Sequence, residues 1–242
     1  MSFVASALIT GGSSGLGYST ARFIAQQRPN WKVFIASRNG ANAATKLNAE
    51  LKKVDGRSTP NVFYLPLDCS SRQAVRQFAE SYSSSSANPP IKALVINAGI
   101  QVVSGVKYSI DGEELTFATN HTGQALLFFL LQKHLADDAH VIYTSSSLHN
   151  SKKGSRMPGA KYVSAEKCAH PEKFDKWDTA VEGRRRYALS KVANVLWLYA
   201  LRKKVKAAGK KWTVAAFEPG ELLVTKVASR LLSNLTLPSS FS

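Results

Sequence analysis

Tyr187 and Lys191 are the residues whose types and spacing point most directly to chemistry. Four positions separate them, so a helix would place both side chains on one face. A free tyrosine has a pKa of about 10, which makes it a reluctant acid or base near neutral pH. A neighbouring ammonium group stabilises the phenolate and lowers that pKa. The pair is therefore typical of a tyrosine that exchanges a proton with a reacting oxygen.

A glycine-rich turn near the N-terminus has the spacing of a phosphate-binding loop. It follows a short apolar run and opens into a helical pattern. Gly11 permits a tight turn, Gly15 lets the backbone approach a pyrophosphate, and Gly17 lets the helix pack closely on the strand. The first turn of such a helix offers unpaired N–H groups to a phosphate. The residues expected to bind there are Gly11, Ser13, Ser14, Gly15, Leu16 and Gly17.

The end of the second expected strand indicates which dinucleotide would bind. In NAD-binding folds, an acidic residue about 20 positions after the glycines holds the ribose 2′-hydroxyl. Ser37 lies at that position here, and Arg38 follows it. Arg38 could grip a 2′-phosphate with two hydrogen bonds and Ser37 could add another, so we expect NADP (NADPH). The alternative for Arg38 is an ordinary exposed arginine. Asp68, after the third strand, could accept a hydrogen bond from the adenine amino group or cap the next helix.

A second Tyr-x-x-x-Lys pair, Tyr199 with Lys203, lies on the same expected helix. The two tyrosines are related by a rotation of about 120°, so they cannot both face one cofactor. Small residues surround Tyr187 and leave room for a nicotinamide. Large apolar residues surround Tyr199, which indicates a core or interface position. We therefore assign the chemistry to Tyr187.

Apolar runs alternate with helical patterns along the chain, which predicts an α/β fold: a Rossmann-type doubly wound parallel sheet with helices on both faces. The strands are expected at 32–37, 61–68, 91–96, 140–144 and 212–217, after a first strand at 7–9. The helices are expected at 41–54, 71–81 and 184–207, with a loop and long helix over 111–135. Residues 148–183 are expected to form a basic insertion on the substrate side.

Composition limits the classes of partner. The net charge is +16, and residues 150–212 hold 17 Lys and Arg against 5 Asp and Glu. Such a field favours a phosphorylated cofactor, nucleic acid or an acidic membrane surface, and a solvated basic face is the alternative. No aromatic-interleaved nucleic-acid module accompanies it, so we expect no specific nucleic-acid partner.

The two cysteines and the hydropathy pattern bear on the compartment. Cys69 and Cys168 form neither a disulfide framework nor a metal-ligand spacing, so we expect no metal and a reducing, cytoplasmic setting. No apolar run approaches the roughly 20 residues of a membrane span, so we expect no transmembrane segment.

Taken in order, six motifs resemble those of the short-chain dehydrogenase/reductase family. They are Thr10 to Gly17, Asn97-Ala98-Gly99, Asn120-His121-Thr122-Gly123, Ser145-Ser146-Ser147, Tyr187 to Lys191, and Pro219-Gly220. The stretches Asp111 to Glu114, Asn120-His121, Ser146 to His149 and Arg184 to Tyr187 resemble the branch that holds retinol dehydrogenases and light-dependent protochlorophyllide reductases.

The resemblance implies a role for each motif residue. Asn120, Ser146, Tyr187 and Lys191 would be catalytic: Ser146 would hold the substrate oxygen, Lys191 would also bind the nicotinamide ribose, and Asn120 would position a water linked to Lys191. Ser145 and Ser147 remain alternatives to Ser146. Further cofactor contacts would come from Asn97, Ala98, Gly99, Pro219 and Gly220, together with Tyr187 and Lys191. Family members often associate through two long helices, which allows a homo-oligomer.

We therefore expect an NADP-dependent oxidoreductase that transfers a hydride between NADPH and a carbonyl or alcohol. The expected pocket walls include Met157, Tyr162, Val163, Phe174 and Trp177, which favours a bulky apolar small-molecule substrate. The alternative is a non-catalytic or impaired nucleotide-binding module of the same fold.

The alternative rests on the end of the chain. Residues 1–242 are expected to form one NAD(P)-binding domain, with a short tail at 226–242 and a sheet that lacks the family's last strand. An open lid side would expose the pocket to water.

Overall fold

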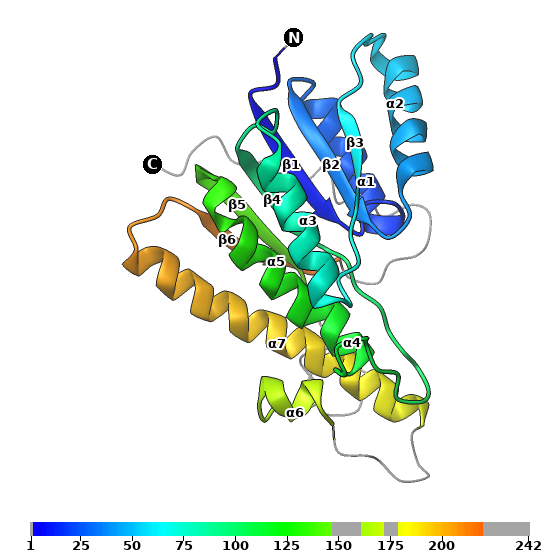
Figure 1. Ribbon diagram of the computed structural model, residues 1–242, viewed down its shortest axis with the longest axis vertical. Coiled ribbons are helices and arrows are strands. Elements are labelled where there is room, and N and C mark those ends of the chain that lie inside the picture. Colours follow the sequence, from blue (N-terminus) through cyan, green and yellow to red (C-terminus); the bar gives the residue numbers. More distant parts are fainter. Residues whose placement is uncertain (1, 147–160, 172–178, 220–242) are drawn as a thin grey trace.

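Six parallel strands, in the order β3-β2-β1-β4-β5-β6, form the centre of the structure, a computed structural model that describes residues 2–146, 161–171 and 179–219 (Figure 1). The strands are β1 (Ala5–Thr10), β2 (Trp31–Ser37), β3 (Val62–Pro66), β4 (Ile91–Ile96), β5 (Leu135–Thr144) and β6 (Thr213–Phe217). The helices are α1 (Gly15–Gln27), α2 (Ala41–Asp55), α3 (Arg72–Ser84), α4 (Leu115–Phe117), α5 (Gly123–Leu131), α6 (Ala165–Ala169) and α7 (Ala180–Ala207). This arrangement confirms the expected doubly wound α/β fold.

Both faces of the sheet are apolar, as a parallel sheet between helices requires. Along β1, Ala7 and Ile9 point to one face and Leu8 to the other, and all three are fully buried. The first face packs against α1 and α2. The second packs against α3, α5 and α7, which lie side by side across the sheet in Figure 1. The order β3-β2-β1-β4 places the reversal of strand order between β1 and β4, where such folds bind dinucleotides.

The region expected to be a loop and one long helix is broken into several pieces. After α4, residues Ala118–Thr122 form a π-helical turn before α5 begins, and a 3₁₀ turn, Gln132–His134, ends the segment. The π turn contains Asn120, whose side chain bonds the backbone of residue 100, so a long-range contact causes the break.

Two boundaries also differ from the sequence-based expectation. β5 starts at Leu135, five residues before the expected start. The sequence did not predict this start, because the exposed Asp137 and Asp138 interrupt the alternation of buried and exposed residues that is typical of a strand. α7 starts at Ala180, inside the expected insertion, with Glu182 in its first turn, where a carboxylate favours the positive helix end.

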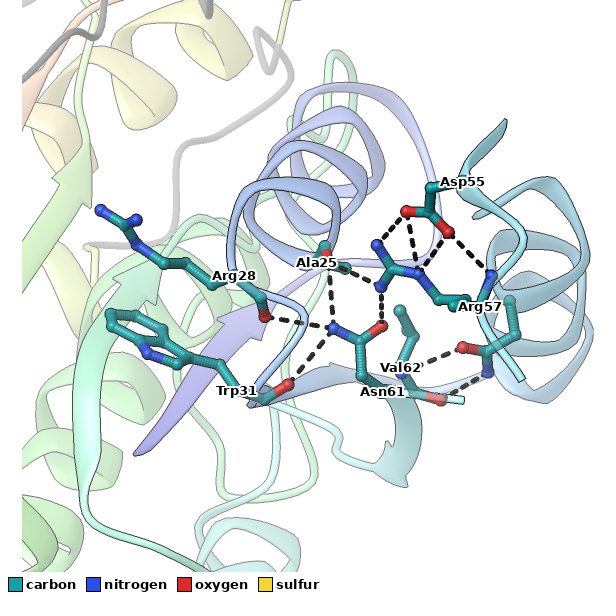
Figure 2. Close-up of polar contacts among 8 residues, drawn as sticks. Ala25, Arg28, Trp31, Asp55, Arg57, Asn61 and Val62 are labelled. Carbon is teal, nitrogen blue, oxygen red and sulfur yellow. Dashed lines mark hydrogen bonds and ion pairs between the residues drawn. The ribbon is translucent and has the colours of Figure 1, made fainter. Parts of the chain in front are cut away.

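A buried asparagine joins the C-terminal end of α1 to the N-terminal ends of β2 and β3. Asn61 is fully buried, and its Nδ2 donates to the carbonyl oxygens of Ala25, Arg28 and Trp31 at 3.0 to 3.3 Å. Its Oδ1 accepts from a terminal guanidinium nitrogen of Arg57 at 2.8 Å. Figure 2 shows this network, with the Arg57 guanidinium held in turn by Asp55. The contacts fix the turn that leads from α1 into β2, at the end of both elements opposite the glycine turn.

Candidate active site

A cavity of about 460 Å³ lies at the carboxyl ends of β1 to β4. Its walls come from the glycine turn, the ends of β2, β3 and β4, and the start of the segment that contains α4. The expected cofactor residues that line it are Gly11, Ser13, Ser14, Leu16, Ser37, Arg38, Asp68, Asn97, Ala98 and Gly99. Residues from five separate stretches of sequence therefore meet at one site, at the position where the topology predicts a dinucleotide.

The glycine turn has the geometry that its sequence requires. Gly11 has φ +66° and Gly15 has φ +52°, both in the left-handed region that favours glycine. A Cβ on Gly17 would lie 2.3 Å from the carbonyl oxygen of Gly11 and 2.7 Å from Nδ2 of Asn97. Gly17 is thus a packing residue rather than a wall of the cavity. The turn leaves the first N–H groups of α1 without helical partners, and Ser14 makes no side-chain cap with them.

The far end of the cavity offers polar groups to a ribose or a phosphate. Ser37 Oγ is buried and has no hydrogen-bond partner within the described part of the chain. Arg38 is exposed beside it, with its carbonyl oxygen held by the Tyr64 hydroxyl at 2.9 Å. No carboxylate occupies this strand end, because Ser37, Arg38 and Asn39 form that wall. The residues present therefore fit a phosphorylated ribose.

Asp68 lines the cavity at the end of β3, and one of its carboxylate oxygens is hydrogen-bonded within its own turn. Its Oδ1 accepts from the N–H and the hydroxyl of Ser70, at 2.9 and 2.7 Å. The interpretation of Asp68 as the cap of α3 is wrong, because Ser71 is the N-cap and accepts from the N–H of Ala74.

Three residues that the sequence-based analysis did not assign hold the walls together. Thr10 Oγ1 accepts from the N–H groups of Asn97 and Ala98, both at 2.9 Å, and donates to Gln124 at 3.1 Å. Gln124 in turn donates to the carbonyl oxygen of Ala98 at 2.9 Å. Thr144 Oγ1 donates to Oδ1 of Asn97 at 3.1 Å. Gln124 is fully buried and its amide is paired, as a polar side chain in an apolar core requires.

Tyr187 and Lys191 lie on one face of α7, as expected. The Lys191 Nζ is 5.5 Å from the centre of the Tyr187 ring and donates to the carbonyl oxygen of Thr144 at 3.0 Å. Burial lowers the pKa of Lys191 to about 8, and it raises the pKa of Tyr187. The expected lowering of the tyrosine pKa by Lys191 is therefore wrong for the protein alone, since burial penalises the phenolate.

Lys191 also connects the tyrosine to the nucleotide cavity. A Cβ built on Gly99, a cavity residue, would lie 3.7 Å from Lys191 Nζ and 3.2 Å from Oδ1 of Asn120. Gly99, Lys191 and Asn120 thus pack closely together. Tyr187 and Lys191 therefore lie next to the cavity.

Asn120 is fully buried and its amide is saturated by protein groups. Its Oδ1 accepts from the N–H of Ile100 at 2.7 Å, and its Nδ2 donates to the carbonyl oxygen of Ile100 and to the Ser190 hydroxyl. Its own carbonyl oxygen accepts from Asn194 Nδ2 at 3.2 Å. Asn194 Oδ1 lies 2.8 Å from His121 Nδ1, so that nitrogen carries the proton. Burial lowers the pKa of His121.

The serines after β5 differ in exposure. Ser145 is buried and its N–H donates to the carbonyl oxygen of Phe217, whereas Ser146 is half-buried. Ser147 lies outside the described residues, as do Gly220 and His149. The half-buried position keeps Ser146 as the better candidate of the two described serines.

Several other expected residues lie away from the cavity or outside the described ranges. Tyr199 is 65% exposed, so a core position for it is wrong. Pro219 is half-buried after β6 and is not among the cavity residues. Of the expected pocket walls, Tyr162 packs beside Phe117 and Val163 is exposed, while Met157, Phe174 and Trp177 lie outside the described residues.

None of the helices in the described ranges is both long and apolar enough to cross a membrane. No three His, Cys, Asp or Glu side chains in the same ranges are placed to hold a metal ion.

Comparison with known proteins places the site in context. A family model described as short chain dehydrogenase matches residues 5–165. Retinol dehydrogenase 12 from Bos taurus is 31% identical over 220 residues, which are 88% of this chain and 60% of that protein. A protochlorophyllide reductase from Daucus carota is 36% identical over 135 residues, 55% of this chain and 31% of that protein.

A solved structure from Mycobacterium paratuberculosis, of an uncharacterized protein, superposes with a TM-score of 0.69 at 25% identity. The match covers 95% of this chain and 73% of that one. By contrast, the chain spans about three fifths of the length of the curated relatives that match most of it, with coverages from 57% to 62%.

Proposed function

Because the chain belongs to the short-chain dehydrogenase family, we propose that it is an NADP-dependent oxidoreductase that transfers a hydride between NADPH and a carbonyl or alcohol substrate. The observation that supports this most is the junction at Gly99. That residue lines the nucleotide cavity and packs against Lys191, which lies below the Tyr187 ring. A proton-exchanging group and a dinucleotide cavity in contact are what such a reaction needs.

Different residues of this chain bind different parts of the dinucleotide. The N–H groups at the start of α1 hold the pyrophosphate, as the positive end of a helix favours an anion. Ser37 and Arg38 would hold the 2′-phosphate, and Asp68 would accept a hydrogen bond from the adenine amino group. Lys191 binds the nicotinamide ribose. Bound NADPH would supply the hydride that adds to the carbonyl carbon.

Tyr187 supplies the proton that balances this addition. Burial keeps its hydroxyl protonated at neutral pH, so it can donate to the oxygen of the reduced substrate. Ser146 holds the same oxygen by its hydroxyl. Asn120 fixes the backbone at Ile100 and, through Ser190, the helix that presents Tyr187. In the oxidation direction, the positive charge of the oxidised nicotinamide would offset the burial of the phenolate.

The preference for NADPH rests on the wall at Ser37 and Arg38. A carboxylate there would repel a 2′-phosphate, and the wall contains none. A buried hydroxyl without a partner beside an exposed guanidinium is a suitable pair for that group. We also propose that the substrate is a small molecule, a bulky apolar carbonyl or alcohol, and that the protein works as a single domain in the cytoplasm. Self-association through α5 and α7 stays a prediction.

Calorimetric titration with NADPH and NADH tests the cofactor proposal. Arg38→Ala is expected to weaken NADPH binding on the order of 10- to 100-fold and to leave NADH binding unchanged. Arg76→Ala, an exposed arginine on α3, is the matched control and should change neither. Equal losses for both cofactors would exclude Arg38 as a phosphate-binding residue. Binding of neither cofactor to the wild type would contradict the function itself.

Tyr187→Phe separates the enzyme from a non-catalytic nucleotide-binding module. Loss of the hydroxyl should lower turnover of an apolar aldehyde or ketone by about 10²- to 10⁴-fold and leave NADPH affinity within a few-fold. Tyr199→Phe removes the hydroxyl of the other Tyr-x-x-x-Lys pair and is expected to keep full activity. A protein that binds NADPH but turns over no tested carbonyl, with or without Tyr187, would be the module instead.

A further inference from the structure

The last two turns of α7 and the turn after them form a strongly basic end of the molecule. Residues 183–217 contain ten Lys and Arg and no Asp or Glu. Six of these cations are clustered at the C-terminal end of the helix, and all six are exposed. They are Arg202, Lys203, Lys204, Lys206, Lys210 and Lys211.

Nothing in the described part of the chain neutralises this cluster. None of the six cations forms an ion pair there, in contrast to Lys92, which pairs with Asp138. The start of β5 is an acidic segment beside the cluster, since Trp212 Nε1 donates to the carbonyl oxygen of Ala136 at 2.9 Å. Asp138 on it is already occupied by Lys92, which leaves Asp137 against six cations. The charge therefore remains available to an anionic partner.

The cations continue an exposed apolar stripe on the same helix face. Leu196, Tyr199, Lys203 and Lys206 follow one another at intervals of three or four residues, which places them in one row. Leu196 is 46% exposed and Tyr199 is 65% exposed. The opposite face, with Leu198, Leu201 and Val205, packs into the core of the sheet. In Figure 1, α7 crosses the lower part of the molecule, with its orange C-terminal end at the left.

We propose that this row, defined as Leu196, Tyr199, Lys203 and Lys206 with the neighbouring Arg202, docks on the surface of an anionic phospholipid bilayer. A bilayer offers both chemistries that the row displays. Its headgroups attract lysine and arginine, and its interfacial layer receives tyrosine and leucine side chains. The apolar and the basic parts lie on one straight helix face, which suits a flat and extended partner.

The charge pattern argues against the two other occupants. In a two-fold pairing of antiparallel α7 helices, the basic end of one copy would lie along Arg184 and Arg185 of the other, and like charges would oppose association. Nucleic acid would match the cations but would leave Leu196 and Tyr199 without a partner. The proposal does not depend on the oxidoreductase function.

Vesicle sedimentation with the full chain tests the charged part of the row. The probes are phosphatidylcholine vesicles and the same vesicles with about 30 mol% phosphatidylserine. The wild type should bind only the second kind, more weakly as salt rises. Arg202→Gln with Lys203→Gln and Lys206→Gln should reduce that binding on the order of 100-fold. Lys52→Gln with Lys53→Gln and Arg76→Gln removes the same residue types from α2 and α3 and should retain it.

A second variant tests the apolar part of the row, and further outcomes test the alternative partners. Leu196→Ser with Tyr199→Ser should weaken binding to the anionic vesicles without changing the net charge. Equal losses in the two charge-matched triple variants would overturn the proposal, because net charge alone would then explain binding. So would duplex DNA binding that outcompetes the vesicles, or a concentration-dependent dimer that the Leu196 and Tyr199 changes abolish. An unchanged circular dichroism spectrum and melting temperature of each variant would show that it is folded.

Discussion

At the residue scale, Lys191 is the group whose titration the structure defines best. It is 4% exposed and donates to the carbonyl oxygen of Thr144. Burial lowers its pKa to about 8, below the ordinary lysine value, so between pH 8 and 10 the unfolded chain binds more protons than the folded one. This group therefore makes the free energy of unfolding rise with pH across that window.

The comparison of the wild type with Lys191→Met tests this sign. The wild type should gain stability relative to the variant by up to about 3 kcal/mol from pH 8 to pH 10, since one pKa unit corresponds to about 1.36 kcal/mol. Urea unfolding at several pH values measures the difference, and groups common to both proteins cancel. A difference that shrinks as pH rises would contradict the depressed pKa.

Asn194 makes a second prediction at this scale. Its amide joins the carbonyl oxygen of Asn120 to the ring of His121. Asn194→Leu keeps the volume and removes both bonds, so it should cost about 1–3 kcal/mol of stability. The exposed Asn42 on α2 is the control, and Asn42→Leu should change stability by no more than about 0.5 kcal/mol. Chemical denaturation distinguishes these outcomes.

At the element scale, local sequence predicts some features and long-range contacts decide the rest. The glycine turn was predictable from local sequence. Gly11 has a left-handed φ, and Gly17 packs too closely against the carbonyl oxygen of Gly11 to carry a side chain. The roles of Gln124 and Thr144 could not be predicted from local sequence, because their partners lie 26 or more positions away along the chain. The break of the helix at Asn120 has the same cause, since its amide is committed to Ile100.

Asn61 offers an element-scale prediction because it fixes where α1 ends and β2 begins. Asn61→Ala would leave the carbonyl oxygens of Ala25, Arg28 and Trp31 with fewer donors in a buried place (Figure 2). The expected loss of stability is about 2–3 kcal/mol. Arg57→Ala should cost less, because its partner Asp55 is partly exposed and water can solvate the carboxylate that is left. If thermal unfolding showed Asn61→Ala to be the milder change, the network would not be what holds this end of the sheet.

At the scale of the whole molecule, the cavity joins elements that no single helix connects. A dinucleotide there would contact α1, β2, the turn after β3 and the end of β4, so it would bind the folded chain and not the unfolded one. NADPH at about 100 times its dissociation constant should add about 2.7 kcal/mol to the free energy of unfolding. For a chain of this size, that corresponds to a rise in melting temperature of roughly 5–10 °C.

Thermal unfolding with each cofactor measures this linkage. Arg38→Ala should lose most of the NADPH-dependent rise while its unliganded melting temperature stays close to that of the wild type, since its side chain is exposed. Gly17→Ala should lose the rise by another route, because its Cβ would meet the carbonyl oxygen of Gly11 and displace the turn. Gly209→Asn, at an open turn with φ +62°, is the control and should keep the full rise. A wild-type melting temperature that neither NADPH nor NADH changes would refute the assignment of the cavity to a nucleotide.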